Sequence, residues 1–387
     1  MFIRDRQIGL TTAGSRPYVI AELGVNHDGS VEKALELVRE AHGAGADAIK
    51  LQLFRTDLLM SSAAKLAAYQ HAAGETDPIS MLRRLELSPV QMMPVLALAR
   101  QLGIHAIVTV FSVELVPEAE EAARVHDGWD AYKTASPDII HRPLLDALAA
   151  TDRPLIVSTG ASTMAEVQRA AEWLGAPRRE KRLAMLQCVS SYPTPEKDAA
   201  LEGISAIASA LPEVPIGYSD HTASEVMGAT AVACGACILE KHFTYDRTAK
   251  GPDHSASLNF AGLKRYVANV RAAYEQRKYC NPSPIRPLQA PVSTLSSSTV
   301  RAGGKHVQDR ERDVRGVSRQ SIVSRRALAV GHRLTRDDIT FKRPGTGVPP
   351  FALEQVVGAL LVCTVEADMP ITWADVGRDA PPDGLEA

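Results

Sequence analysis

The stretch from Pro215 to His254 decides the fold. It reads Pro215-Ile216-Gly217-Tyr218-Ser219-Asp220-His221-Thr222, continues through small residues to Ala236-Cys237-Ile238-Leu239-Glu240-Lys241-His242, and then reaches Gly251-Pro252-Asp253-His254. Two short apolar runs each end in a polar cluster that contains a histidine. In a parallel α/β barrel, the carboxyl ends of the strands meet at the active site. We therefore expect His221 and His242 at neighbouring strand ends, with converging side chains.

This histidine pair predicts a metal site. Two neutral imidazoles in such an arrangement suit a divalent metal of the Mn, Fe, Co or Zn type. A single histidine at a strand end is more often a satisfied core residue, so two core histidines are the alternative. Asp253 and His254 follow in the next loop, and these additional polar groups favour the metal site.

Strand-like and helix-like segments alternate on the N-terminal side of this stretch. Six further apolar runs, each followed by a helical pattern, begin near Tyr18, Asp47, Ile104, Trp129, Pro154 and Leu183. A last helical run covers Phe260 to Tyr274. Eight strand–helix units over about 260 residues predict an α/β fold, a closed (β/α)₈ TIM barrel. A doubly wound open sheet is the alternative, but no glycine fingerprint follows the first strand.

The composition changes near Cys280, where proline, serine and then arginine become frequent. We expect residues 1–278 to form the barrel, 279–318 a linker, and 319–380 a small β-rich module. About 60 residues cannot bury much core. The module is therefore expected to pack against another part of the protein or of its assembly.

The overall composition excludes several classes of protein. The chain has 387 residues, of which 45% are hydrophobic and 23% charged, with a formal net charge of −2. No basic field favours nucleic acid or an anionic membrane, and no apolar run has the length needed to span a bilayer. The first residues are charged and resemble no signal peptide, and five cysteines form no disulfide framework. We expect a cytoplasmic protein.

Polar side chains gather at the predicted strand ends. Charged groups there are costly unless they are paired or functional, and a structural ladder of ion pairs is the alternative to a site. Lysines with hydroxyls suit a phosphate or carboxylate, and carboxylates such as Glu22 and Asp253 could meet a polyol or transfer protons. A phosphorylated substrate, a metal and a sugar-like partner fit the set together, which comprises Glu22, Lys50, Gln52, Thr109, Lys133, Ser136, Ser158, Thr159, Ser190, Ser219, His221, Glu240 and His242.

The segments together resemble the sialic acid synthase family, which includes legionaminic and pseudaminic acid synthases. A C-terminal stretch, Lys342-Arg343-Pro344-Gly345-Thr346-Gly347, looks like the family's antifreeze-like (SAF) domain. The resemblance covers nearly the whole chain. The matching barrel stretches are Ile20–Gly29, Ala48–Gln52, Lys133–Ser136, Leu155–Gly160, Ser191–Pro195, Gly217–Thr222, Glu240–Thr244 and Gly251–His254.

The resemblance implies a reaction and an assembly. The reaction is condensation of phosphoenolpyruvate with an N-acetylmannosamine-type aldose to a nonulosonic acid, with release of phosphate. Such a transferase serves polysaccharide biosynthesis. It depends on a divalent metal, with Mn²⁺ expected and Mg²⁺ or Co²⁺ as alternatives. The implied assembly is a domain-swapped homodimer, in which the SAF domain of one subunit covers the barrel of the other.

The resemblance also implies roles for particular residues. His221 and His242 match the metal ligands. An arginine of the partner subunit's SAF domain reaches the acceptor's N-acetyl group, and Arg319 is the match we predict. The catalytic candidates are Glu22, Lys133, Asp138 and Asp253, with Asp138 standing where some members carry a Glu. The remaining matches are Thr109, Lys133, Ser136, Ser158, Ser190 and Ser219 for phosphoenolpyruvate, and Glu22, Lys50, Gln52, Tyr192 and Asp253 for the acceptor sugar.

Other functions stay open at this point. A Schiff-base aldolase could use Lys133 or Lys50 on the same barrel. A non-catalytic carbohydrate-binding protein would keep the fold without the chemistry. Heptulosonate and octulosonate phosphate synthases share the reaction logic but lack the SAF module. N-acetylmannosamine and the diacetamido sugars of the legionaminic and pseudaminic routes all remain candidate acceptors.

Overall fold

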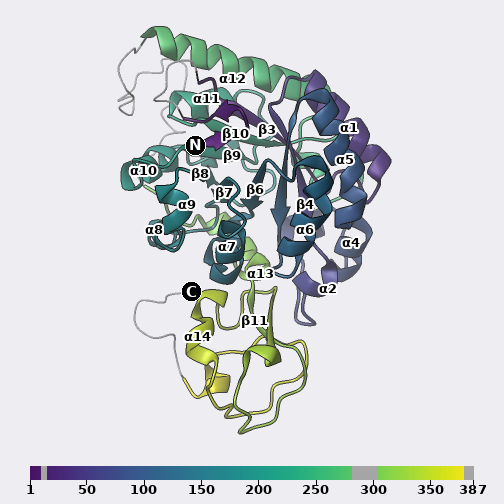
Figure 1. Cartoon of the computed structure of the whole chain (residues 1–387), viewed down its shortest axis with the longest axis vertical. Coiled ribbons are helices and arrows are strands. Elements are labelled where there is room, and N and C mark those ends of the chain that lie inside the picture. The colour runs from purple at the N-terminus through teal and green to yellow at the C-terminus, as the bar shows by residue number, and fades with distance from the viewer. Residues whose placement is uncertain (10–14, 281–303, 379–387) are drawn as a thin grey trace.

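The computed structural model describes residues 1–9, 15–280 and 304–378. A large barrel domain carries a smaller C-terminal domain at one end, as Figure 1 shows. The smaller domain lies on the side of the barrel where the β-strands end. This placement decides which part of the barrel can be a site.

Eight parallel strands form a closed barrel, which confirms the (β/α)₈ prediction. Each strand pairs with the next one along the chain, and the last pairs with the first, because Ile238–His242 aligns with Tyr18–Glu22. The strands are β3 (Tyr18–Gly24), β4 (Ala48–Leu53), β5 (His105–Val110), β6 (Ala131–Thr134), β7 (Leu155–Ser158), β8 (Leu183–Cys188), β9 (Ile216–Asp220) and β10 (Ile238–His242).

Helices surround the barrel, and local sequence signals set their ends. Ser30 caps the first of them by accepting a hydrogen bond from the Lys33 backbone N–H. At the helix Pro89–Leu102, Ser88 and Gln91 form a capping box at the start, and Gly103 ends the helix in the left-handed conformation at φ 70°. The outer helices are α1 (Val31–Gly43), α5 (Pro89–Leu102), α6 (Leu115–Ala123), α7 (Arg142–Ala149), α8 (Met164–Trp173), α10 (Glu202–Ala210), α11 (Met227–Ala233) and α12 (Phe260–Cys280).

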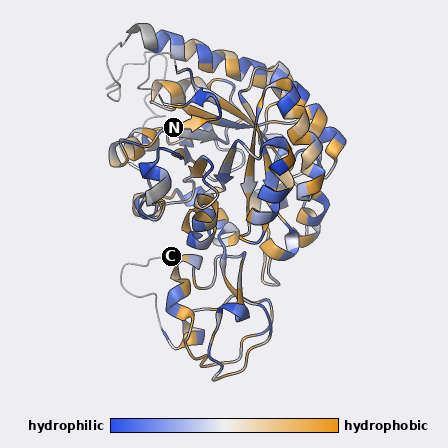
Figure 2. Ribbon diagram, viewed as in Figure 1, coloured by the Kyte–Doolittle hydropathy of each residue, from blue (hydrophilic) through white to orange (hydrophobic). Residues whose placement is uncertain are grey.

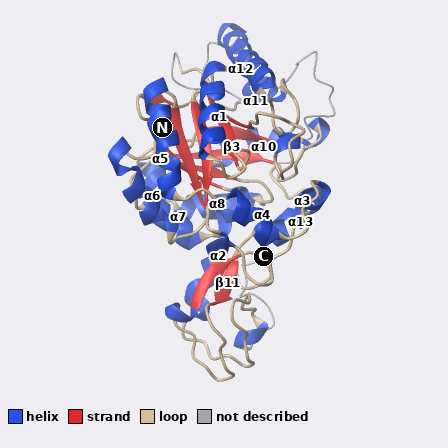
Figure 3. Ribbon diagram, turned by 90° about the vertical axis from the view of Figure 1, so that its right-hand side faces the viewer, coloured by secondary structure: helices blue, strands red, loops and turns tan. Residues whose placement is uncertain are grey.

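Shorter helices lie in the loops between the strands and the outer helices. Three lie between β4 and α5, namely α2 (Thr56–Leu59), α3 (Ala68–Ala72) and α4 (Pro78–Leu85). A further short helix, α9 (Gly175–Arg179), follows α8. The first three are at the end of the barrel that faces the C-terminal domain, as Figure 3 shows for α2 and α4.

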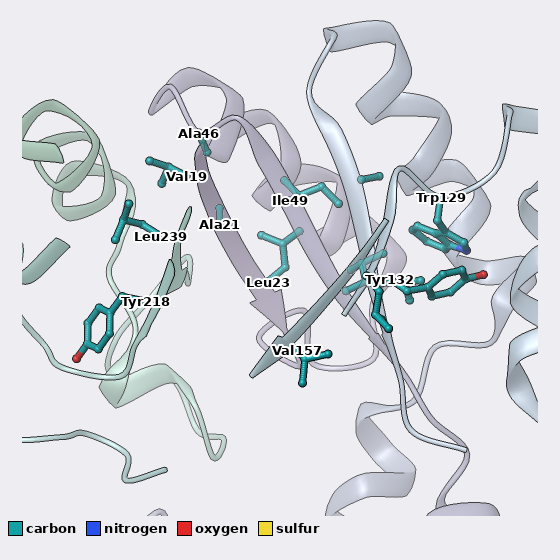
Figure 4. Packing of buried hydrophobic residues seen from close by; sticks show 14 of the residues in the cluster. Val19, Ala21, Leu23, Ala46, Ile49, Trp129, Tyr132, Val157, Tyr218 and Leu239 are labelled. Atoms are coloured by element: carbon teal, nitrogen blue, oxygen red, sulfur yellow. The ribbon is translucent and has the colours of Figure 1, made fainter. Parts of the chain in front are cut away.

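The main core lies between the strands and the outer helices. Val19, Leu23 and Ile49 belong to it with Trp129 and Tyr132, and all are buried; Figure 4 shows part of this packing. The outer helices alternate apolar and polar residues, visible as mixed orange and blue ribbon in Figure 2. Their apolar faces cover the barrel.

A separate apolar cluster fills the interior of the barrel at the end where the strands begin. Ile20, Ile107 and Ile156 point inward there. A short hairpin, β1 (Phe2–Ile3) and β2 (Arg6–Gln7), adds buried apolar residues of its own to this cluster. This end of the barrel is closed by packing, so the site lies at the other end.

The C-terminal domain has a core of its own, which includes Ile322, Leu334 and Val348. Its strands β11 (Ser321–Ser324) and β12 (Ile339–Lys342) pair antiparallel, and α14 (Leu353–Val356) packs beside them. Before it, α13 (Arg312–Ser318) and a 3₁₀ turn at Asp309–Glu311 contact the barrel. Part of the predicted linker is therefore an ordered segment. Within the described ranges, no helix combines the length and apolarity needed to cross a bilayer.

Candidate active site

The strand register places the predicted polar residues side by side. Glu22 lies next to Lys50 on one side and His242 on the other. Thr109 lies between Gln52 and Lys133. Ser219 is opposite both Glu240 and Cys188. Because side chains alternate along a strand, these residues form one polar layer above the apolar interior.

Two lysines and two glutamates form a buried quartet in this layer. Lys50 Nζ lies 2.8 Å from Glu22 Oε2 and 3.8 Å from Glu240 Oε2. Lys133 Nζ lies 3.3 Å from Glu240 Oε1, which also accepts a 2.8 Å hydrogen bond from Ser219. Gln52 and Thr109 complete the set, since Gln52 donates to Glu22 at 2.7 Å and Lys50 donates to Thr109 at 2.9 Å.

The quartet sets the charge states of its members. Burial alone would raise the pKa of Glu240, but Lys133 and Lys50 outweigh burial and hold it at about 2. Burial lowers the pKa of Lys133, against the attraction of Glu240. Burial raises the pKa of Glu22, against the attraction of Lys50. The ladder of ion pairs that was the alternative to a site therefore exists, but it lies in the wall of a cavity.

The two histidines lie together as predicted. Their ring centroids are 5.4 Å apart, and both rings are buried. His221 Nδ1 is 2.7 Å from the Val189 carbonyl oxygen. A carbonyl only accepts, so Nδ1 carries the proton and Nε2 is left as a possible ligand. His242 Nδ1 is a buried nitrogen to which no described residue gives a hydrogen bond.

The pKa directions of the histidines differ. Burial, together with the neighbouring His221, lowers the pKa of His242 well below its usual value, so this ring is neutral. Burial also acts to lower the pKa of His221, but the Cys188 thiol and the Val189 carbonyl outweigh it and raise that pKa. Among the described residues, no group of three or more His, Cys, Asp or Glu side chains could hold a metal. An ion bound by the two histidines would take its other ligands from water or substrate.

Hydroxyls from the carboxyl ends of three neighbouring strands, β6, β7 and β8, line the same cavity as Lys133. Gly160 N–H donates to Ser136 Oγ at 3.0 Å. A Cβ on Gly160 would lie 2.7 Å from Ser136 Oγ and 2.3 Å from Ser190 Oγ, so glycine is required for this approach. The hydroxyls of Ser158 and Ser190 are buried, and no described residue offers them a hydrogen bond. These groups form a cradle with free donors, which we call the serine cradle (Ser136, Ser158, Gly160 and Ser190).

The catalytic candidates Asp253 and Asp138 have similar pKa shifts but different places. Burial, reinforced by Glu22, raises the pKa of Asp253 to about 6, and its carboxylate lies 3.6 Å from His242 Nδ1. Burial also raises the pKa of Asp138 to about 6. Asp138 does not line the cavity, however, and its Oδ1 accepts a hydrogen bond from Gln320 at 3.1 Å.

One cavity of about 120 Å³ joins these groups at the mouth of the barrel. Aromatic rings form part of its wall, with Tyr192 stacked 4.1 Å from His221 and 4.8 Å from Tyr69, measured between ring centroids. Apart from Asp138, Thr159 and Arg319, every residue predicted for the site lines it, namely Glu22, Lys50, Gln52, Thr109, Lys133, Ser136, Ser158, Ser190, Tyr192, Ser219, His221, Glu240, His242 and Asp253.

The C-terminal domain contributes a different arginine from the predicted one. Arg319 lies outside the cavity, where it donates to Glu166 at 2.8 Å and to the Ala161 carbonyl at 3.2 Å. Arg343 lines the cavity instead, with its guanidinium 5.5 Å from the Phe111 ring centroid. Its backbone is pinned to the barrel, because Arg343 N–H donates to the Leu59 carbonyl at 2.8 Å.

Among the other lining residues, Glu240 was placed in the polar set of the strand ends without a role, and Arg343 was missed as a site residue. Glu240 precedes His242 by two positions on one strand, and that spacing places both on the same face. Arg343 lies within the Lys342–Gly347 stretch that indicated the C-terminal domain. Each therefore carried a signal in the sequence.

The fold and this cavity define a (β/α)₈-barrel protein with a polar site at the strand ends and a small C-terminal domain over it. The chain belongs to the NeuB family, because residues 37–280 match that family. Residues 319–377 match the SAF domain.

Similar proteins span nearly the same length. The chain is 32% identical to an N,N'-diacetyllegionaminic acid synthase from Legionella pneumophila subsp. pneumophila, over 93% of this chain and 94% of the relative. It is 28% identical to a pseudaminic acid synthase from Campylobacter jejuni subsp. jejuni, over 91% and 94%. The crystal structure of the spore coat polysaccharide biosynthesis protein SpsE from Bacillus subtilis superposes with a TM-score of 0.80 at 28% identity, covering 97% of this chain and 98% of that one.

Proposed function

We propose that the protein is a nonulosonic acid synthase that condenses phosphoenolpyruvate with an N-acetylated aldose and releases phosphate. One observation carries the proposal: the histidine pair, the two lysines and the serine cradle line a single cavity at the strand ends. The names of the similar synthases support the same class of product.

Phosphoenolpyruvate would bind on the side of Lys133 and the serine cradle. Its phosphate and carboxylate need hydrogen-bond donors and positive charge. The unpaired hydroxyls of Ser158 and Ser190 and the ammonium of Lys133 supply both. Thr109 and Ser219 extend this donor surface along the barrel wall.

The acceptor sugar would bind between the quartet and the C-terminal domain. Glu22 and Gln52 offer groups that pair with sugar hydroxyls, and the Tyr192 ring offers an apolar face. Arg343 reaches the cavity from the C-terminal domain and offers donors to an acyl oxygen of the acceptor. The similarity to a diacetyllegionaminic acid synthase favours a diacetamido trideoxy mannose as this acceptor.

The reaction balances with one water molecule. C3 of phosphoenolpyruvate forms a bond to the aldehyde carbon, water adds at C2, and phosphate leaves as the C2–O bond breaks. Holding the two substrates in attack geometry supplies much of the acceleration. Asp253, with its pKa raised to about 6, is placed to accept a proton near neutral pH, and Glu22 is the alternative.

His221 and His242 fit a divalent metal, because Nε2 is the unprotonated ring nitrogen of His221 and Nδ1 of His242 is buried without a hydrogen bond from any described residue. Mn²⁺ is the ion we propose, with Mg²⁺ or Co²⁺ as alternatives. When bound, such an ion polarises a carbonyl oxygen as a Lewis acid. The rings themselves are held by the Val189 carbonyl and the stacked Tyr192.

The decisive experiment measures phosphate release from phosphoenolpyruvate with Mn²⁺, offering N-acetylmannosamine and the two diacetamido sugars in turn. We expect release that depends on one sugar and that is lost with EDTA and in His242→Ala. Folded, metal-loaded protein that releases no phosphate with any of the three would contradict the proposal.

A second candidate, a Schiff-base aldolase, is favoured by the buried Lys133 in the cavity wall, since a lysine amine is the nucleophile in that chemistry. Borohydride treatment with a keto acid separates the two functions. A covalent adduct that disappears in Lys133→Met would support the aldolase. Absence of an adduct in an active enzyme would exclude it.

A further inference from the structure

The arginine-rich segment before the C-terminal domain is not a simple connection. Glu311 of this segment is fully buried. Its Oε1 accepts hydrogen bonds from the Ala161 N–H at 2.6 Å and the Ser190 N–H at 2.7 Å, and its Oε2 accepts one from the Gln308 N–H at 2.9 Å. A buried carboxylate with these bonds is strongly held in place.

The two barrel amides belong to neighbouring loops. Ala161 follows β7 and Ser190 follows β8, and the ladder between these strands ends with the bond from Thr159 N–H to the Leu186 carbonyl. Beyond that point, Glu311 is the group that joins the two loops. Glu311 therefore links the backbone next to Gly160 with the backbone of Ser190, and both of these residues belong to the serine cradle.

Ala161 is held in an unfavourable conformation by the same segment. Its φ of 50° lies in the left-handed region, which is unfavourable for a non-glycine residue. Glu311 holds its N–H, while Arg315 and Arg319 donate to its carbonyl at 2.7 and 3.2 Å. Strained backbone that is held from several sides is typical of functional sites.

Both arginines are themselves fixed. Arg315 donates to the two Glu166 oxygens at 2.9 and 3.0 Å, and Arg319 donates to Glu166 at 2.8 Å. These contacts hold the pKa of Glu166 at about 2, against the effect of its burial. Lys305 adds a buried ammonium, which donates to the Cys188 carbonyl at 3.3 Å. The segment is thus held to α8 by paired charges, and to the end of β8 and the loop after β7 by hydrogen bonds to backbone carbonyls.

We propose that residues 304–319 form a buttress and that Glu311 is a positioning residue that sets the serine cradle for the phosphate-bearing substrate. This inference rests on the proposed binding of phosphoenolpyruvate at that cradle. Glu311 touches no substrate. It acts through the Ala161 and Ser190 backbones, so its loss displaces the hydroxyls of the cradle and leaves the acceptor side unchanged.

The test compares Glu311→Ala, Glu311→Gln and the matched control Asp309→Asn, whose carboxylate is exposed and pairs with Arg312 at 3.0 Å. We expect Glu311→Ala to raise the KM for phosphoenolpyruvate by about tenfold or more, the loss that a charge-assisted hydrogen bond implies. The acceptor KM should stay within about twofold. Glu311→Gln keeps one acceptor oxygen and should recover part of the loss, and Asp309→Asn should match wild type.

Calorimetry with phosphoenolpyruvate and Mn²⁺, without acceptor, separates this inference from the proposed function. Wild-type protein that binds phosphoenolpyruvate in calorimetry, but releases no phosphate when the acceptor sugars are added, would refute the synthase. The effect of Glu311 would still be tested through the dissociation constant for phosphoenolpyruvate. If Glu311→Ala does not fold, Arg315→Met replaces it and should give a smaller rise in the same constant. Unchanged affinity for phosphoenolpyruvate in a folded variant would overturn the inference. An equal rise in the KM values of both substrates, together with a lower kcat and a lower Tm, would also overturn it.

Discussion

Lys133 shows at the scale of one residue how the site and the fold depend on each other. Its ammonium is buried beside Glu240, and removing one partner of a buried pair leaves an uncompensated charge. We predict that Lys133→Met lowers the free energy of unfolding by about 3–5 kcal/mol. Urea denaturation measures this change.

Two comparisons make the Lys133 prediction specific. Lys33→Met removes a lysine that is 43% exposed and pairs with Asp28 at 2.7 Å, so it should cost less than about 1 kcal/mol. The double variant Lys133→Met with Glu240→Gln should cost less than the sum of the single variants. Strict additivity would contradict the account of the quartet.

Asp138 makes a prediction about pH. Burial raises its pKa from 3.8 to about 6, although Arg343 and Gln320 act in the opposite direction. Between these values the native protein binds more protons than the unfolded chain. The contribution of Asp138 to the free energy of unfolding therefore falls as the pH rises from about 4 to about 6. This fall is complete once the pH exceeds the pKa of Asp138 in the folded protein.

Asp138→Asn should remove this loss, since asparagine keeps an oxygen for the Gln320 hydrogen bond and has no charge to bury. Urea unfolding at pH 4.5 and 7 should show a smaller fall in stability for Asp138→Asn than for wild type. Parallel curves for the two proteins would show that the pKa of Asp138 is not raised.

Most lining residues could be predicted one by one from the sequence, and the exceptions have a physical reason. Lys50, His221 and His242 sit at the ends of apolar runs, so a period of two and the barrel rule place them. Arg343 reaches the cavity because its backbone is hydrogen-bonded to Leu59 and Ser61, which are distant from it in the sequence. No local pattern reports such a contact, and Arg319 was chosen in its place.

At the scale of an element, the N-terminal hairpin tests what closes the barrel. Ile3 is fully buried with Ile20 and Ile107, while the neighbouring Phe2 is 57% exposed. We predict that Ile3→Ala lowers the free energy of unfolding by about 2–5 kcal/mol. Phe2→Ala is the matched control and should change it by less than about 0.5 kcal/mol. Equal effects in urea denaturation would mean that the hairpin does not plug the barrel.

The barrel elements themselves were predictable, whereas the segment at residues 304–319 was not. Strand–helix alternation is a local pattern, and each of the eight strands recurs in the structure. The segment reads as a linker because its arginines look solvated. Arg315 and Arg319 pair instead with Glu166, about 150 positions away in the chain, and only the tertiary fold brings that carboxylate to them.

At the scale of the whole molecule, the position of the C-terminal domain raises the question of assembly. We propose a homodimer in which this domain is exchanged. In the single chain the domain covers its own barrel, through Arg343, Ser61 and Gln320, and an exchanged dimer would form the same interface between two chains. The exposed side chains of Val330, Leu360 and Val362 offer apolar surface for association.

Mixing two inactive variants tests the exchange. His242→Ala lacks one of the two proposed metal ligands in the barrel, and Arg343→Ala lacks the arginine that the C-terminal domain contributes to the cavity. If the domain is exchanged, unfolding and refolding the two together creates dimers with one intact site, and activity should return. Wild-type-like recovery of folded dimers by light scattering without activity would contradict the exchange.

We propose that one cavity joins phosphoenolpyruvate to an aldose. The most direct test is the ratio of phosphate released to nonulosonic acid formed in one reaction, with the product identified by mass spectrometry. We predict one phosphate for each product molecule, whose mass equals the two substrates plus water minus phosphoric acid. Phosphate released without a condensed product would contradict it.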